Sequence, residues 1–337
     1  MDNRINKLSA LLCCMLFSVI QSFASESIYG DVDGSGMTDI KDVTALINHL
    51  LSGEEIYNTS GNDIDVDLAS KLGRPQCICH AYGSVQAVKE NTISYFRKGI
   101  GQGFNFFEVD AVNCADGVPV CSHVRADHSY TVYGKTDVSR TPQTIDIQSL
   151  TSTDLVENYT WTAPTVDGNG IITAYGEPIA LLSDVIWYVC YFHHCLLHVD
   201  GQGMTKASRL AASQYANSLG VGQYVFHELQ GGAYTDWEIP CNAIIRCTSA
   251  EDIINKAATY KKNGNNIIFY YSSTSGDTTD EKLHSLAEAA HSVGCYTMSW
   301  TFNKVDQTRR WFKAGFDFLI TSGASQNNIV TITNNHI

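Results

Sequence analysis

The chain has 337 residues, 44% of them hydrophobic, and a formal net charge of -13. This length suffices for one large core with a small module beside it. The negative charge argues against a nucleic-acid backbone or an anionic membrane surface as the main partner.

The N-terminal segment, residues 1–24, is typical of a secretory signal peptide. Arg4 and Lys7 precede an apolar run over residues 8–23, and the small residues Ser22 and Ala24 frame a cleavage site. We therefore expect a secreted, extracellular protein. No later stretch reaches roughly 18 uninterrupted apolar residues, so we expect no membrane-spanning segment in the mature chain.

A calcium-binding loop is predicted directly after this segment, at residues 31–42. Oxygen-bearing side chains occupy loop positions one, three, five, nine and twelve, and a glycine at position six allows the sharp turn. These side chains are Asp31, Asp33, Ser35, Asp39 and Asp42. Together with the helical spacing that follows, the segment resembles one half of a type I dockerin.

The dockerin resemblance covers residues 26–72, in which the first repeat is good and the second is degenerate, with Ile56 where the first aspartate belongs. It implies calcium in the N-terminal loop and a cohesin module as partner. A calcium-stabilised spacer without a cohesin partner is the alternative reading of the same segment.

From residue 75 onward, short apolar runs alternate with amphipathic helical segments, the pattern of parallel strands joined by crossover helices. Strands are predicted at Cys77 to His80, Phe106 to Asp110, Cys195 to Asp200, Gln223 to His227, Ala243 to Cys247, Ile267 to Tyr271, Cys295 to Thr301 and Asp317 to Thr321. Helices are predicted at Asp280 to Ser292, at Val305 to Ala314 and in a run that includes Ala257 to Lys262. Eight strands predict an α/β fold, a TIM (β/α)8 barrel over residues 75–322, followed by a tail at 323–337.

The cysteines fit no zinc pattern, because none of their spacings provides paired ligands at the required distances. Nine cysteines follow the signal segment, and most are expected as small apolar residues of the barrel. Cys114 and Cys121 flank a tight turn and are the best candidates for a disulfide.

Titratable side chains stand at the predicted carboxyl ends of the strands, where barrels of this kind carry their chemistry. The first strand ends in His80 and the third in Asp200. The second ends in Glu108 and Asp110, which are two residues apart and therefore share a face. His123 follows after the next turn. Three carboxylates suit a hard divalent cation, and two histidines can transfer protons.

The order of these residues resembles the glycerophosphodiester phosphodiesterase family. The family motifs appear here as His80, Glu90-Asn91-Thr92, Glu108 with Asp110, Asp116-Gly117 and His123, with further likeness around residues 177–185 and 300–321. The resemblance implies cleavage of a small phosphodiester into glycerol phosphate and an alcohol. It implies His80 and His123 as acid and base, calcium or magnesium on Glu108, Asp110 and Asp200, and substrate contacts from Gln202 and Trp300.

Two basic residues of the family pattern are replaced. Ala81-Tyr82 follows the first histidine where the family has an arginine, and Gln202 stands where the family has a lysine. Each charge-assisted contact to a phosphate is worth on the order of 1.5–3 kcal/mol. A catalytically impaired relative that only binds a phosphodiester is therefore an alternative, and Lys206 and Arg125 are nearby cations that could substitute.

Two further functions stay open. The calcium loop would suit a docking component of an extracellular enzyme complex. The carboxylates Glu228, Asp236 and Glu238 would suit a glycosidase, although all three are predicted in one loop region.

Overall fold

The computed structural model describes residues 68, 71–73, 75–80, 88–229, 241–260, 265–272 and 278–321. The chain divides into two compact units, Met1–Val66 and Asp67–Ile337, and every described residue belongs to the second. The predicted signal peptide, the calcium loop at residues 31–42 and the tail at 323–337 lie outside the described residues and stay predictions, as do the predicted domain boundaries. Within the described residues, no helix is both long and apolar enough to cross a membrane.

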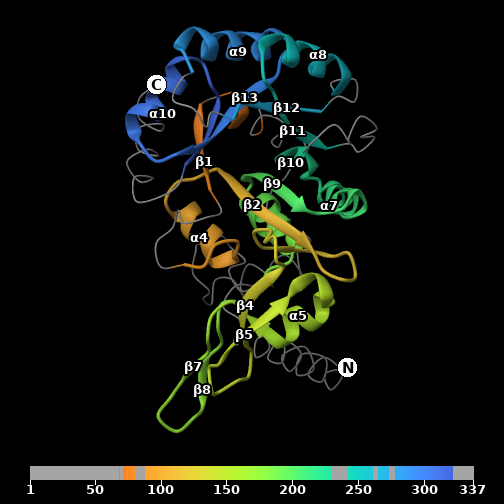
Figure 1. Cartoon of the computed structure of the whole chain (residues 1–337), viewed down its shortest axis with the longest axis vertical. Coiled ribbons are helices and arrows are strands. Elements are labelled where there is room, and N and C mark those ends of the chain that lie inside the picture. Colours follow the sequence, from red (N-terminus) through yellow and green to blue (C-terminus); the bar gives the residue numbers. More distant parts are fainter. Residues whose placement is uncertain are drawn as a thin grey trace, which may run out of the picture. The chain divides into compact units, whose positions relative to one another are not determined.

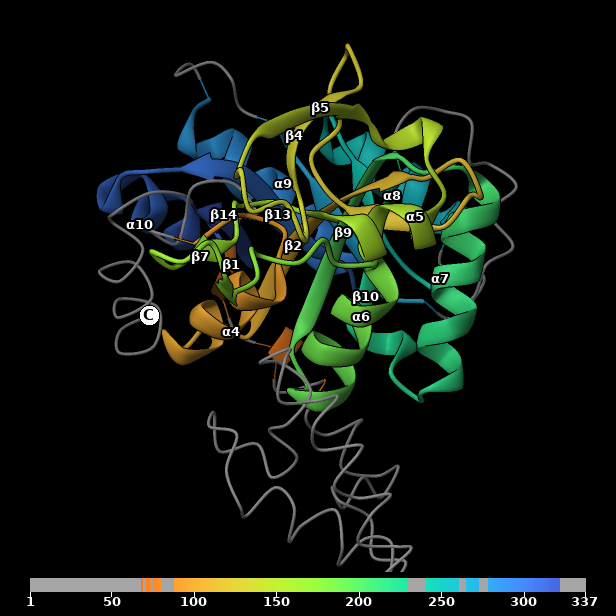
Figure 2. The ribbon, with the colours of Figure 1, turned by 90° about the horizontal axis from the view of Figure 1, so that it is seen from below.

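Eight parallel strands close into a barrel, which confirms the predicted fold (Figures 1 and 2). Around the barrel the order is β1, β14, β13, β12, β11, β10, β9 and β2, and β2 pairs with β1 to complete the ring. The strands are β1 (Gln76–Cys79), β2 (Phe106–Asn113), β9 (Leu196–Gly203), β10 (Val225–Leu229), β11 (Asn242–Arg246), β12 (Ile267–Tyr270), β13 (Tyr296–Phe302) and β14 (Phe318–Thr321). Each predicted strand is present, with ends shifted by three residues at most.

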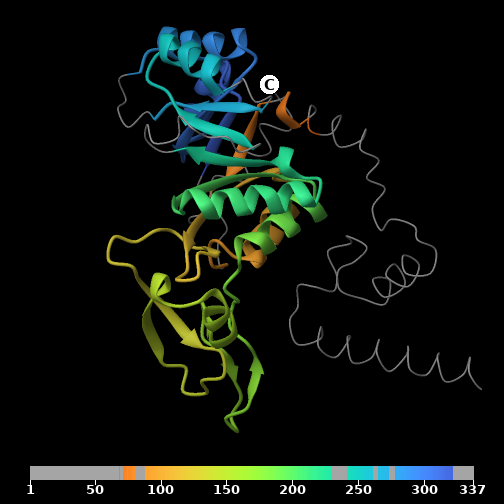
Figure 3. The same cartoon turned by 90° about the vertical axis from the view of Figure 1, so that its right-hand side faces the viewer.

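Helices pack around the outside of the barrel; α7, in green, runs beside the strands in Figure 3. They are α4 (Ile93–Gly101), α6 (Leu182–Val185), which continues as a π-helix (Ile186–Phe192), α7 (Lys206–Ser218), α8 (Ala250–Tyr260), α9 (Asp280–Ser292) and α10 (Val305–Lys313). Short 3-10 turns lie at Ile147–Ser149 and Gly222–Tyr224. The start of α4 has a local cause, because the Thr92 hydroxyl accepts a hydrogen bond from the Tyr95 amide as an N-cap.

The alternation of side chains along the strands separates an inner from an outer layer. Phe106 points into the barrel, where its ring lies 5.8 Å from that of Phe226 and 5.3 Å from that of Phe318. The next residue, Phe107, points outward and packs against α4. Glu108, two residues after Phe106, is again on the inner side. The inward aromatic rings thus form a floor beneath polar side chains at the carboxyl ends of the strands.

A small subdomain is inserted between β2 and α6. The chain continues from β2 into β3 (Pro119–Cys121) and then forms β4 (Ser129–Gly134), β5 (Pro142–Asp146), α5 (Ser152–Asn158), β6 (Tyr159–Thr160), β7 (Thr165–Val166) and β8 (Ile172–Ala174). Tyr130, Leu155 and Trp161 share one apolar cluster with Val112 of β2. The cluster joins the insertion to the carboxyl end of β2, the end at which the site was predicted (Figure 1).

The predicted disulfide between Cys114 and Cys121 is wrong. In the antiparallel pairing of β2 with β3, Cys121 lies opposite Ala111, whereas the amide of Cys114 donates to the carbonyl of Val118. The two thiols are therefore out of register by three residues. None of the nine cysteines forms a disulfide, and all nine are buried. They act as small apolar side chains, in agreement with the sequence-based expectation.

One buried histidine gives the fold an acid sensitivity that can be measured. His227 on β10 has its Nε2 3.0 Å from the Ser213 hydroxyl, and burial, aided by the positive charge of Arg209, lowers the pKa of His227 from 6.5 to about 3. Between these pH values the unfolded chain binds a proton that the folded chain does not. The free energy of unfolding therefore decreases below pH 6.5, by about 1.4 kcal/mol per pH unit for this group.

We expect His227→Gln to remove that contribution, which is about 2 kcal/mol at pH 5. The melting temperature of the unmodified protein should drop further between pH 7 and pH 5 than that of the variant, by roughly 4–8 °C. Thermal unfolding in a chelator at the two pH values measures the difference, with His284→Gln, an exposed histidine on α9, as the control. Equal drops in all three proteins would contradict the assignment.

Candidate active site

Three carboxylates meet at the mouth of the barrel, where sequence analysis placed a cation. Glu108 and Asp110 lie on β2, and the strand register sets Asp200 of β9 directly opposite Asp110. One oxygen of each residue lies within 4.8 Å of the others. Burial raises the pKa of Asp110, and burial together with the negative charge of Glu228 raises the pKa of Asp200 to about 6. The three carboxylates thus concentrate negative charge at a site with little access to solvent, and a bound cation would neutralise that charge.

The geometry of the three carboxylates fits a divalent cation. Two oxygen ligands of one calcium or magnesium ion lie at most about 4 to 5 Å apart. The three carboxylate oxygens, within 4.8 Å of one another, meet this limit. Oδ1 of Asp200 is buried and has no hydrogen-bond partner among the described residues, whereas its Oδ2 accepts from Gln202 Nε2 at 2.8 Å. An oxygen without a donor is available as a metal ligand, and the all-oxygen set suits a hard ion.

Asn91 fixes the position of Asp110. Its Nδ2 donates to Asp110 Oδ2 at 2.8 Å, and its Oδ1 accepts from the Asp110 amide at 2.9 Å. Asn91 is buried and has φ of 59°, a left-handed conformation that asparagine tolerates better than most residues. The Glu-Asn-Thr motif seen in the sequence therefore places an amide beside a ligand carboxylate.

We expect Asn91→Gly to weaken metal binding by roughly 10- to 100-fold, because it removes both contacts to Asp110 and leaves the backbone conformation allowed. The lost contacts to buried groups should also lower the free energy of unfolding by about 1–3 kcal/mol. Titration of metal against thermal stability measures both effects. Arg140→Gly, at an exposed residue with φ of 56°, is the matched control and should leave metal affinity unchanged.

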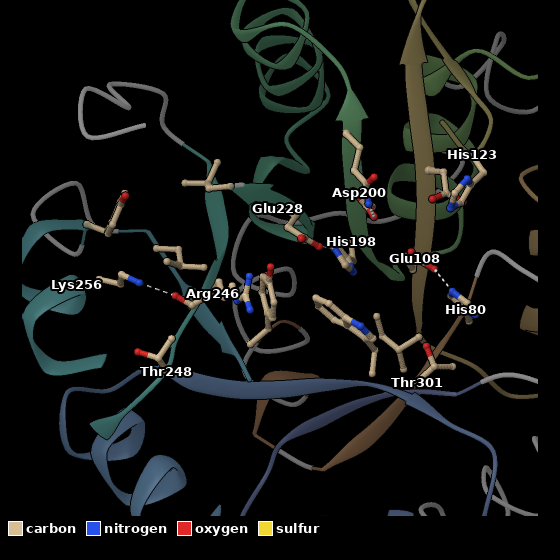
Figure 4. A pocket seen from close by; sticks show the side chains of 18 residues that line it. His80, Glu108, His123, His198, Asp200, Glu228, Arg246, Thr248, Lys256 and Thr301 are labelled. Carbon is tan, nitrogen blue, oxygen red and sulfur yellow. Dashed lines mark hydrogen bonds and ion pairs between the residues drawn. The ribbon is translucent and has the colours of Figure 1, made fainter. Parts of the chain in front are cut away.

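The two predicted histidines line the same cavity as the carboxylates, as Figure 4 shows. His80 directly follows β1, and its Nε2 lies 3.6 Å from Glu108 Oε2. The Tyr95 hydroxyl donates to the His80 carbonyl and so fixes the backbone there. His123 Nδ1 lies 2.7 Å from the Val124 carbonyl. Because a carbonyl only accepts, Nδ1 carries the hydrogen and Nε2 is the atom that can exchange a proton.

A buried pair beside the carboxylates was missed from the sequence. His198 Nε2 lies 3.0 Å from Glu228 Oε2, and the two side chains are only 1% and 3% exposed. Glu228 also accepts from the Tyr270 hydroxyl, and burial together with this carboxylate raises the pKa of Tyr270. Glu228 lies in β10, so its prediction as a loop residue is wrong, while Asp236 and Glu238 lie outside the described residues.

The cavity at the barrel mouth has a volume of about 780 Å³. His80, His123 and the three carboxylates form one side of it, and a second side carries cationic and aromatic groups (Figure 4). That second side holds Arg246, Thr248 and Lys256, and the aromatic residues Tyr260, Tyr270 and Trp300 also line the cavity. Gln202 also lines the cavity, and the Trp300 ring packs 4.3 Å from the Tyr270 ring.

The cations in this cavity differ from those considered in the sequence. Lys206 is not among the lining residues, and Arg125 lines a neighbouring cavity of about 220 Å³ that shares His123. In the described part of the lining, the cations are Arg246 and Lys256. Both come from the β11–α8 segment, which carries no recognisable motif.

Residues 82–191 match the sequence model of the glycerophosphoryl diester phosphodiesterase family. The match covers 110 of the 337 residues and contains His123 and two of the three carboxylates. With the closed barrel around it, this family domain supports the predicted enzyme class, a phosphoric diester hydrolase of the glycerophosphodiester phosphodiesterase type. The sequence matches none of the curated proteins.

Solved structures of several phosphodiesterases share the fold. A glycerophosphoryl diester phosphodiesterase from Parabacteroides distasonis is 18% identical, with a TM-score of 0.54 over 77% of this chain and 87% of that one. A glycerophosphodiester phosphodiesterase from Thermotoga maritima is 16% identical, with a TM-score of 0.51 over 78% and 99%. An Oleispira antarctica phosphodiesterase in complex with the product sn-glycerol-3-phosphate is 12% identical, with a TM-score of 0.50 over 79% and 98%. At these identities the likeness establishes the barrel fold.

Proposed function

We propose that the protein is a secreted, metal-dependent hydrolase that cleaves glycerophosphodiesters to glycerol phosphate and an alcohol. The observation that carries the proposal is the convergence of Glu108, Asp110 and Asp200 with His80 and His123 in one cavity. The family match over residues 82–191 supports it, as does the product, sn-glycerol-3-phosphate, bound to the Oleispira antarctica relative of the same fold.

The carboxylates and histidines would divide the chemistry between them. Glu108, Asp110 and Asp200 would hold calcium or magnesium, and the ion would offset negative charge on the phosphoryl oxygens. One histidine would remove the proton of the nucleophile, which is either the neighbouring glycerol hydroxyl or water. Attack by the hydroxyl would release the alcohol and leave a cyclic phosphate, which water would then open to glycerol phosphate. As the new P–O bond forms and the old one breaks, the other histidine would give a proton to the departing alkoxide. Asn91 and Gln202 would keep the ligand carboxylates in place.

The test is hydrolysis of glycerophosphocholine and glycerophosphoethanolamine by the mature chain, with calcium, magnesium or a chelator. Turnover that requires one of the metals supports the proposal. Metal binding seen as a rise in melting temperature, without turnover of either substrate, would instead support the alternative of a protein that only binds phosphodiesters.

Export is the second part of the proposal, supported by the basic and apolar pattern of residues 1–24. The protein recovered from the medium of expressing cells should begin close to residue 25 when its N-terminus is sequenced. Retention of the full N-terminus inside the cell would contradict export.

A further inference from the structure

Arg246 is a solvent-exposed cation that lines the cavity. It is the last residue of β11 and lies on the side of the cavity that faces the histidines (Figure 4). The other lining cation, Lys256, is engaged, because its Nζ donates to the Arg246 carbonyl at 2.7 Å and pairs with Asp252 at 3.0 Å. The Arg246 guanidinium forms no ion pair with any carboxylate in the described part of the chain.

The surroundings of Arg246 suit an anion that comes with the substrate. The strand register sets Arg246 opposite Tyr270, whose ring lies against that of Trp300 at an interplanar angle of 41°. Thr248 lies two residues further along the same wall. A guanidinium can bind a carboxylate with two parallel hydrogen bonds. The chain has a net charge of -13 and repels anions. A cation such as Arg246 would offset that repulsion for a substrate that carries a second negative group besides its phosphate.

The register places Arg246 away from the carboxylate cluster. Glu228 lies opposite Ile244. Arg246 is two residues further along β11 and is therefore about 6–7 Å nearer the mouth of the barrel than Glu228. His227 lies opposite Val199, which puts Glu228 at the level of Asp200. Two strand spacings, about 10 Å, separate β11 from β9. The backbones of Arg246 and Asp200 are thus roughly 12 Å apart, a gap that the two side chains and a small headgroup between them would span together.

We propose that Arg246 binds a negatively charged group on the alcohol portion of the substrate and selects glycerophosphodiesters whose headgroup carries its own anion. The inference rests on the proposed function, since it assumes that the reacting phosphorus lies at the carboxylates and histidines. The cavity of about 780 Å³ has room for such a headgroup on the Arg246 side.

Two substrates that differ by a single carboxylate test the proposal. Glycerophosphoserine is glycerophosphoethanolamine with one carboxylate added to the headgroup. The measured quantity is the ratio of kcat/KM for the serine diester to kcat/KM for the ethanolamine diester. Arg246→Gln should lower this ratio by roughly 10- to 100-fold, the loss of one charge-assisted contact. Arg246→Lys keeps the charge without the fork and should give an intermediate ratio.

Arg309→Gln is the matched control, because it removes one positive charge from the exposed face of α10 and should leave the ratio unchanged. An unchanged ratio in Arg246→Gln overturns the inference, including the case in which both substrates lose activity equally. If the unmodified protein hydrolyses neither of these substrates nor glycerophosphocholine, the proposed function fails. Calorimetric binding of the same two molecules then decides the inference, which stands only if Arg246→Gln loses affinity for the serine diester selectively.

Discussion

Replacing either His80 or His123 with alanine should lower kcat for glycerophosphodiester hydrolysis by about 10²- to 10⁴-fold. Each imidazole lies at the cavity beside the carboxylates, and an alkoxide is too poor a leaving group to depart without a proton. The change should appear in kcat, because neither histidine is a ligand in the carboxylate cluster. Steady-state kinetics with a saturating metal concentration measures it.

A diester with a nitrophenolate leaving group separates the two roles. Nitrophenolate leaves without protonation, so the variant that lacks the acid should recover most of its activity on this substrate, and the variant that lacks the base should not. His284→Ala, an exposed histidine on α9, is the matched control and should match the unmodified protein. Near-normal turnover of glycerophosphocholine by a folded His80→Ala or His123→Ala protein would refute the assignment.

The barrel was predictable because its strands are short apolar runs separated by helical segments. The site on β2 was predictable for the same reason, since residues two apart on a strand share a face, as Glu108 and Asp110 do. The same rule applied to β9 would have found His198, which stands two residues before Asp200. His198 was therefore predictable from the strand period alone.

Glu228 and Arg246 were harder to find. The predicted fourth strand ended at His227, one residue before Glu228, so a buried strand carboxylate was assigned to a loop. Strand ends are poorly specified by local sequence, because pairing with neighbours determines them. Arg246 follows an apolar run with no motif, and its place in the cavity depends on the pairing of β11 with β10 and β12. No local pattern carries that information.

Local sequence failed to predict the contact of Asn91 with Asp110, and it predicted a disulfide between Cys114 and Cys121 that does not form. The contact from Asn91 to Asp110 joins residues 19 positions apart and requires a left-handed backbone, and neither feature is visible in composition or periodicity. Cys114 and Cys121 are close in sequence and flank a turn, but the hairpin register holds them apart. Proximity in sequence predicted the bond, and strand pairing prevents it.

Asp200→Asn should change the stability of the protein in opposite directions without and with metal. Burial and the Glu228 charge raise the pKa of Asp200 from 3.8 to about 6, so at pH 7 the ionised carboxylate destabilises the metal-free fold by about 2–3 kcal/mol. An amide removes that charge and should raise the melting temperature of the metal-free protein. It also removes a ligand, and the rise in melting temperature on addition of calcium or magnesium should largely disappear.

The same change should lower kcat/KM by about 10²- to 10⁴-fold, because the ion supplies several kcal/mol of charge stabilisation in the transition state. Thermal unfolding with a chelator and with each metal, together with hydrolysis of glycerophosphocholine, measures both effects on one preparation. Asp306→Asn, at an exposed carboxylate of α10, controls for the loss of one negative charge. A metal response that survives in Asp200→Asn would remove Asp200 from the ligand set. If the metal-free variant is instead less stable than the unmodified protein, the Asp200 carboxylate makes a favourable contact in the fold. Repulsion among the three carboxylates would then not destabilise the metal-free protein.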